Sequence, residues 1–245
     1  MKHARVTAEA RVKTPENAEK VIAEGKADMV SIVRGQIADP HLANKAREGR
    51  PEDIRPCISC NQLCLGRRLR DYWVSCISNP SVARETQWDG DSTPPTSKPR
   101  HVLVVGGGPA GLEVARVAAA RGHRVTLVEK TAELGGQFRL AAGQPERGEI
   151  GALLHWYRGQ LEKLQVQVKL RTEMSAADIK AAGADAVVLC TGDRIGIDLL
   201  PDYLRFPQQT DQPAMIVPSE GLSLKDAVSR YERGMILQSL EMANG

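Results

Sequence analysis

The stretch Val102-Leu-Val-Val-Gly106-Gly-Gly108-Pro-Ala-Gly111 decides the fold of the second half of the chain. Its apolar run predicts a buried strand, and its spaced glycines predict a tight turn into a helix. Gly106 permits the turn, Gly108 lets backbone amides approach a pyrophosphate, and Gly111 permits close packing of the helix on the strand. The stretch therefore predicts a dinucleotide site.

An acidic residue after the next predicted strand supports this interpretation. Glu129 follows Gly111 by 18 residues, where a carboxylate can accept hydrogen bonds from the adenosine ribose. A carboxylate there would repel a 2′-phosphate, so FAD or NAD is favoured over NADP. Gly136 and Gln137 follow in a loop that we expect to pass close to the cofactor. A glycine-rich turn without a ligand is the alternative.

Apolar segments of strand length alternate with amphipathic segments of helix length over residues 101–193. This alternation predicts a doubly wound parallel sheet, here a partial Rossmann-like domain that binds FAD or NAD. A polar segment rich in proline, residues 88–100, predicts a linker in front of it. The expected strands are 102–105, 124–129, 166–170 and 185–190, and the expected helices are 109–121, 149–164 and 175–182.

Four of the five cysteines form a second motif, Cys57-Ile-Ser-Cys60-Asn-Gln-Leu-Cys64 with Cys76 further on. Eleven residues separate Cys64 from Cys76, and this spacing is expected to collect the four thiolates around one point. Three ligands in so short a run, with one remote, favour a 4Fe-4S cluster over a tetrahedral zinc, which is the alternative. The cluster would pass single electrons to two-electron partners such as flavins. Cys190 is left as an unpaired core residue.

The first 56 residues predict two strand–helix units. Residues 4–12 and 28–33 are the expected strands; Thr14-Pro15 starts one helix, and Asp39-Pro40 starts another that stops at Gly49. Such units indicate a piece of a parallel α/β structure. A complete eight-stranded barrel takes about 200 residues or more, so we expect only its end here. Arg34, after the second strand, is a candidate phosphate ligand or a solvated side chain.

Composition argues against some partners. The net charge is only +3, with 33 basic and 30 acidic side chains, which gives no general reason to expect nucleic-acid or membrane binding. The sequence contains no run approaching the roughly 18 apolar residues of a spanning helix, and its N-terminus lacks an apolar leader. We therefore expect a cytoplasmic protein.

Residues 4–193 resemble the iron-sulfur branch of the old yellow enzyme flavoproteins, the group of 2,4-dienoyl-CoA reductase and trimethylamine dehydrogenase. The matching segments are residues 27–40, the cysteine block, Asn79-Pro80 and the glycine turn. The resemblance implies that residues 1–56 end an FMN-binding TIM barrel, that residues 57–87 hold a 4Fe-4S cluster and that residues 101–193 bind FAD or ADP. It also places Arg11 and Arg34 by the FMN phosphate, although Ala10 stands where the family usually has glycine.

The resemblance further implies a flavin-dependent oxidoreductase that draws electrons from NAD(P)H and passes them from FAD through the cluster to FMN. Its small-molecule substrate would be an activated alkene such as 2,4-dienoyl-CoA, or alternatively an amine of the trimethylamine or dimethylamine type. The sequence lacks the family's first six barrel strands, which carry the groups that protonate substrate. We therefore name no catalytic residue and expect this chain alone to be inactive.

Residues 194–245 look foreign to that family. They are similar to the segment that precedes the helix-turn-helix domain in nitrogen-regulation-type transcription activators. Residues 223–243 predict an amphipathic helix, with its apolar side chains on one face. The competing interpretation of the whole chain is thus a non-catalytic, chimeric fragment whose terminal helix pairs with a partner helix, as in a homo-oligomer. The basic residues of this helix are matched by acidic ones, so we expect no specific nucleic-acid binding. The apolar face of the helix predicted over residues 223–243 consists of Leu224, Val228, Tyr231 and Met235.

Overall fold

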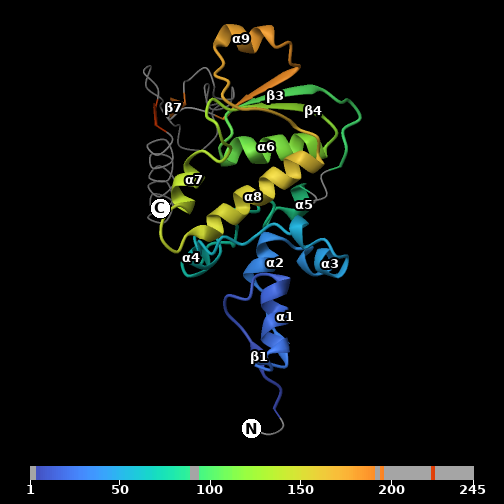
Figure 1. Cartoon of the computed structure of the whole chain (residues 1–245), viewed down its shortest axis with the longest axis vertical. Coiled ribbons are helices and arrows are strands. Elements are labelled where there is room, and N and C mark those ends of the chain that lie inside the picture. Colours follow the sequence, from blue (N-terminus) through green and yellow to red (C-terminus); the bar gives the residue numbers. More distant parts are fainter. Residues whose placement is uncertain (1–3, 89–93, 191–193, 196–221, 224–245) are drawn as a thin grey trace, which may run out of the picture. The chain divides into compact units, whose positions relative to one another are not determined.

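The computed structural model describes residues 4–88, 94–190, 194–195 and 222–223 of the chain (Figure 1). The chain divides into two units, residues 1–190 and residues 191–245. In the second unit, β7 (Arg194–Ile195) pairs antiparallel with β8 (Leu222–Ser223). Ser223, the expected first residue of the terminal helix, thus lies in a strand, and residues 224–243 of that helix fall outside the described residues.

The first unit contains a four-stranded, all-parallel sheet with the order β5-β4-β3-β6. The central strand β3 has five residues, of which four are buried, and so does its neighbour β4. The strands and helices expected within residues 102–190 are all present, so this part of the prediction is confirmed. The strands are β3 (His101–Val105), β4 (Arg124–Val128), β5 (Gln167–Lys169) and β6 (Ala186–Leu189).

Helices cover both faces of this sheet (Figure 1). The helices α6 (Pro109–Ala120) and α8 (Gly148–Lys163) contribute to the larger core on one face, where Leu112 and Leu153 are buried. The short helix α9 (Ala176–Ala181) lies over the other face, where its Ile179 packs against a smaller core. A helix that we did not expect, α7 (Gln137–Ala142), precedes α8.

The N-terminal segment begins with a two-stranded parallel sheet, β1 (Thr7–Ala8) and β2 (Met29–Val30). The expected helix between them is confirmed as α1 (Pro15–Ala23), which is capped by the Thr14 side chain. The prediction of longer strands, the second buried on both faces, is wrong. Met29 is 51% exposed and Val33 is 62% exposed, because no described neighbour covers them.

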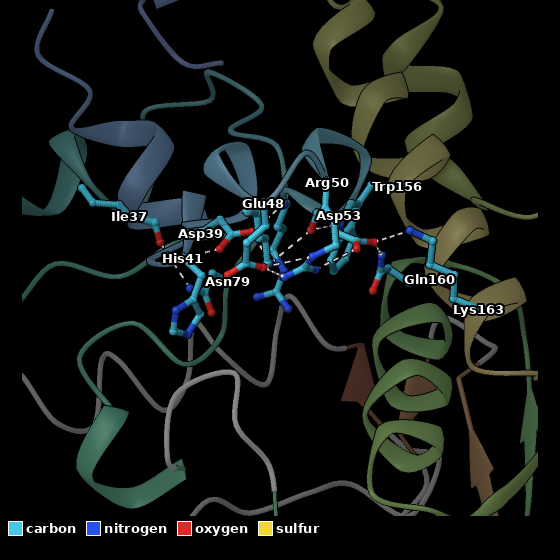
Figure 2. A network of polar contacts seen from close by, with 12 residues as sticks. Ile37, Asp39, His41, Glu48, Arg50, Asp53, Asn79, Trp156, Gln160 and Lys163 are labelled. Atoms are coloured by element: carbon cyan, nitrogen blue, oxygen red, sulfur yellow. Dashed lines mark hydrogen bonds and ion pairs between the residues drawn. The ribbon is translucent and has the colours of Figure 1, made fainter. Parts of the chain in front are cut away.

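Three short helical segments follow β2. They are α2 (Arg34–Ala38), α3 (Leu42–Arg47) and the 3-10 helix η1 (Pro51–Asp53). The helix expected to start at Asp39-Pro40 therefore starts later, and Asp39 instead follows α2 as a fully buried side chain. Its carboxylate accepts hydrogen bonds from His41 N, Lys45 Nζ and Arg55 N at 2.6–2.9 Å, which hold the three segments together (Figure 2).

The cysteine segment belongs to the same core as the sheet. Ile58 is buried within the cluster that contains Leu112 of α6 and Leu127 of β4, and Cys60 and Ile77 pack against that cluster. Two short helices, α4 (Leu65–Arg68) and α5 (Glu85–Trp88), complete this part of the chain. Within the described residues, no helix is both long enough and apolar enough to cross a membrane.

Candidate functional site

The glycine turn between β3 and α6 has the geometry that its sequence predicts. Gly106 has φ +108°, a value that favours glycine. A Cβ atom at Gly111 would lie 1.9 Å from the Gly106 carbonyl oxygen, so only glycine lets the helix approach the strand. A Cβ atom at Gly108, which caps α6, would meet nothing within 4 Å. The start of α6 is therefore open, and backbone amides at such a helix terminus favour anions.

Glu129 braces this turn from the end of β4. Its Oε2 accepts a hydrogen bond from Gly107 N at 2.7 Å, and its Oε1 accepts one from Thr131 N at 2.8 Å. Burial raises the pKa of Glu129, but these backbone donors outweigh it and leave the pKa below its usual value. The carboxylate is therefore charged at neutral pH and already engaged with the backbone. Each oxygen retains a second lone pair that can accept a hydroxyl donor.

Gly107 is a functional position that the sequence reasoning missed. A Cβ atom there would lie 2.6 Å from Leu134 Cδ2 and 3.1 Å from Glu129 Cβ. The residue therefore has to be glycine so that the turn can reach the carboxylate. In the sequence, the indication of this requirement is that Gly107 stands in a run of consecutive glycines, Gly106 to Gly108.

The loop with Gly136 and Gln137 lies against the turn, as expected. Gly135 N donates to Gly107 O at 2.8 Å, and a Cβ atom at Gly136, whose φ is +49°, would lie 3.1 Å from Gly108 Cα. Gln137 is exposed and begins α7. The structure thus brings the glycine-rich positions and Glu129 together at one end of β3 and β4.

The four cysteines of the block also come together. All four are unpaired, and all four line a single pocket. No group of three or more His, Cys, Asp or Glu side chains in the described ranges is arranged to hold a metal ion. The thiols of a single zinc site would have to meet about 2.3 Å from one point, whereas a four-iron cluster has each thiolate on a different iron and needs them further apart. The pocket also contains Arg34, Ile37, Ile58, Asn61, Leu63, Ile77 and Ser78.

The loop after Cys76 is fixed by buried polar groups. Burial raises the pKa of the Cys76 thiol, and the backbone amides of Asn79 and Ser78 oppose this rise in part. Asn79 is 3% exposed; its Nδ2 donates to Ile37 O at 3.3 Å, and its Oδ1 accepts from Ser81 N at 3.0 Å (Figure 2). Asn79 therefore holds the cysteine loop against α2, which explains its place in the motif.

Ser78 is buried at 1% exposure, and its hydroxyl has no hydrogen-bond partner within the described part of the chain. Buried side-chain hydroxyls in native proteins are almost always satisfied. The side chain lines the cysteine pocket. No sequence signal singled this residue out.

The two arginines expected at a phosphate have separate partners. Arg34 Nη1 donates to Asn61 Oδ1 at 2.6 Å and lines the cysteine pocket. Arg11 is exposed, and its Nη2 lies 3.3 Å from Glu149 Oε1 of α8. The two side chains have no partner in common among these contacts. Ala10, where glycine was expected, has φ +63°, a conformation that glycine adopts more easily.

Cys190, the fifth cysteine, lies away from the block at the end of β6. It is partly buried against the main core, and burial raises the pKa of its thiol. A Cβ atom at Gly111 would lie 3.4 Å from its Cβ. Cys190 is thus a core residue behind the glycine turn, as expected.

Comparison with known proteins identifies relatives of this chain. Residues 84–203 match the family described as pyridine nucleotide-disulphide oxidoreductase. The chain is 43% identical over 182 residues to an NADH oxidase from Thermoanaerobacter brockii, a match that covers 74% of this chain and 28% of the relative. It is 36% identical over 230 residues to an N,N-dimethylglycine/sarcosine dehydrogenase from Chromohalobacter salexigens, with coverage of 94% and 33%.

A solved structure shows the same relationship in three dimensions. The complex of 2-naphthoyl-CoA reductase with 2-naphthoyl-CoA superimposes with a TM-score of 0.73 at 40% identity, over 78% of this chain and 29% of that one. The chain therefore spans a third or less of the length of each of these proteins. The 230-residue match, in a chain of 245, extends past residue 193. These comparisons do not show the resemblance of residues 194–245 to transcription activators.

Proposed function

We propose, from the relationship of this chain to the flavin-dependent oxidoreductases, that its first 190 residues hold a 4Fe-4S cluster and a flavin or adenine nucleotide and pass electrons between them. The chain's relatives include an NADH oxidase, an amine-oxidising dehydrogenase and a reductase of an aromatic CoA thioester. Oxidation or reduction of a small molecule is common to all three.

One observation carries this proposal: four free thiols line one pocket, and the segment that holds them shares its core with the glycine turn. Such a cluster exchanges single electrons when bound. Cys57, Cys60, Cys64 and Cys76 would be its ligands. The buried Ile58 and the contact from Asn79 to Ile37 hold the backbone beside these cysteines.

The second site would hold a dinucleotide. The amides at the start of α6, exposed by Gly108, would bind the pyrophosphate, and Gly106 and Gly111 shape the turn that presents them. The charged Glu129 would accept hydrogen bonds from the ribose and disfavour a 2′-phosphate. Gly136 and Gln137 would border the ligand from the neighbouring loop. FAD is the proposed ligand, with ADP as its smaller substitute.

The substrate class belongs to the whole protein, of which this chain supplies only a part. We propose an activated alkene such as an enoyl thioester, because the likeness to 2-naphthoyl-CoA reductase extends over 78% of this chain at 40% identity. An N-methylated amine is the second candidate, favoured by the longest match, which reaches across 94% of the chain. NAD(P)H would be the electron donor in either case.

FMN binding by Arg11 and Arg34 also stays a proposal. Arg34 bonds to Asn61, and Arg11 lies beside Glu149, so these contacts do not by themselves form a shared phosphate site. We therefore derive no step from FMN binding. We further propose the domain limits given above and a cytoplasmic location. For residues 194–245, the long match favours a tail that belongs to the oxidoreductase over one taken from a transcription activator.

Anaerobic reconstitution of the purified chain with ferrous iron and sulfide tests the cluster. We expect about four iron and four sulfide per chain, with a brown visible absorption, and loss of both in Cys60→Ser. The matched control is Cys190→Ser, which removes the free thiol outside the pocket and should leave the iron content unchanged. Equal loss in both variants, or stoichiometric zinc without iron in the wild type, would contradict the proposal.

A further inference from the structure

The Ser78 hydroxyl is a buried polar group that the contacts of the described residues leave unused. Its residue is 1% exposed, and its Oγ has no hydrogen-bond partner there. A group bound in the adjoining pocket would satisfy this donor.

The pocket that Ser78 lines decides what that group would be. Four of its lining residues are the cysteines, and the other polar side chains, Arg34 and Asn61, already bond to each other at 2.6 Å. A hydroxyl can donate one hydrogen bond and can rotate to do so. In such a pocket, the acceptors available to the hydroxyl would be the sulfur atoms of the cluster and of its thiolate ligands.

We propose that Ser78 donates a hydrogen bond from Oγ to a sulfur of the bound 4Fe-4S cluster and thereby raises the reduction potential of the cluster. This inference rests on the proposed cluster site. One-electron reduction adds a negative charge to the cluster, and a donor to sulfur stabilises the more negative form. Groups that contact the ligands rather than the metal set redox potentials in this way. Ser78 would therefore be a tuning residue and not a ligand.

The neighbouring serine offers a matched control. Ser75 is also buried, at 4% exposure, and it precedes Cys76 directly, but it is not among the residues that line the pocket. Replacing either serine by alanine removes one oxygen and leaves the backbone unchanged. A difference between the two variants then reports the hydroxyl that lines the pocket and not a general loss of packing.

The test uses the full-length chain reconstituted with iron and sulfide, and begins with the iron and sulfide content of the wild type. If the wild type holds no cluster, the proposed function fails first. If it does, the reduction potential is measured by redox titration with electron paramagnetic resonance detection. At a fixed potential, we expect the ratio of reduced to oxidised cluster to be about tenfold lower in Ser78→Ala than in the wild type. This corresponds to a reduction potential that is lower by about 59 mV for one electron. Ser75→Ala should titrate as the wild type does.

Two further measurements keep the result decisive. Iron–sulfur stretching bands in the resonance Raman spectrum should shift in deuterated water for the wild type and lose part of that shift in Ser78→Ala. Ser78→Thr, which retains a hydroxyl, should restore the potential. Equal potentials in the wild type and Ser78→Ala, with intact clusters in both, would overturn the role of Ser78 and leave the cluster site standing. If Ser78→Ala fails to bind iron, Ser78→Gly, which also lacks the hydroxyl, takes its place in the titration, and an unchanged potential there would likewise overturn the role.

Discussion

The carboxylate Oδ1 of Asp53 lies 2.6 Å from Nζ of Lys163, and this contact joins the segment before the cysteines to α8 (Figure 2). The same carboxylate accepts from Gln160 Nε2 at 3.0 Å and from Arg50 Nη1 at 2.9 Å. Trp156 Nε1 adds a bond to the Asp53 carbonyl at 3.0 Å. A single residue of η1 is thus the junction between two parts of the chain.

The charge on Asp53 predicts loss of stability in acid. Burial raises its pKa, but hydrogen bonds from Lys163, Arg50 and Gln160 outweigh this and lower it from 3.8 to about 2. Because the folded pKa lies below the unfolded one, the stabilisation is present above about pH 4 and is lost as the pH falls towards 2. Solvent screens the half-exposed Lys163 and Arg50, so the contribution is at most about 1 kcal/mol. Urea denaturation between pH 2 and 7 should show this slope, and Asp53→Asn should flatten it. Asp71→Asn, at a side chain 95% exposed, should leave the slope unchanged.

Gly111→Ala should destabilise the fold strongly. The added Cβ would lie 1.9 Å from a backbone oxygen that cannot move without opening the turn, so we expect a loss of at least about 3 kcal/mol. Chemical denaturation followed by Trp156 fluorescence measures it. Gly159→Ala in α8, where the Cβ meets nothing within 4 Å, is the control and should gain up to about 1 kcal/mol through helix propensity. Equal effects of the two substitutions would contradict the tight packing at Gly111.

Gly108→Leu should remove nucleotide binding while sparing the fold. The position is open, so the leucine fits the free protein but occupies the space over the first amides of α6. We expect at least a tenfold loss of ADP affinity by calorimetry, with little change in denaturation midpoint. Gly148→Leu places the same side chain at the equally open first residue of α8 and should bind ADP as the wild type does. Matching ADP affinity in all three proteins would rule out the turn as the binding site.

Glu129→Gln keeps the shape of the side chain and removes its charge. The amide has one oxygen, so it can accept from the buried Gly107 N or from the exposed Thr131 N but not from both, and the other N–H then faces an NH2 group. An unmade buried hydrogen bond costs about 1–3 kcal/mol. We expect a stability loss of that size together with weaker ADP binding. Unchanged stability would show that the carboxylate does not brace the turn.

The sequence predicted the sheet domain well and the N-terminal segment poorly, for one physical reason. Strand β3 is buried by helices of its own chain, so its apolar run and the glycines after it predict its buried environment directly. The apolar alternation of residues 4–12 carries the same signal, yet Val6 is 50% exposed. Burial of such a strand depends on neighbouring strands, and the described part of this chain does not supply them.

The candidate site divides in a similar way. Fixed glycine spacing and clustered cysteines are local sequence signals, so the turn at Gly106 and Gly111 and the proximity of the four thiols could be predicted; their roles as ligand-binding residues stay predictions. Gly107 and Ser78 were missed because their importance comes from residues distant in sequence. Leu134 and Glu129 leave Gly107 no room for a side chain, and the pocket around Cys57 isolates the Ser78 hydroxyl. The position of Arg11 beside Glu149, on a helix far along the chain, was equally beyond local patterns.

The common core of Ile58 and Leu112 has a thermodynamic consequence. Unfolding of the cysteine segment requires the removal of Ile58 from packing that also holds α6, so the opening of the two sites shares one free-energy cost. A ligand that binds only the closed glycine turn raises that cost in proportion to the logarithm of its concentration. Iron should therefore leave the chain more slowly, in the presence of a chelator, when ADP saturates the other site. The nucleotide would protect the metal centre without touching it.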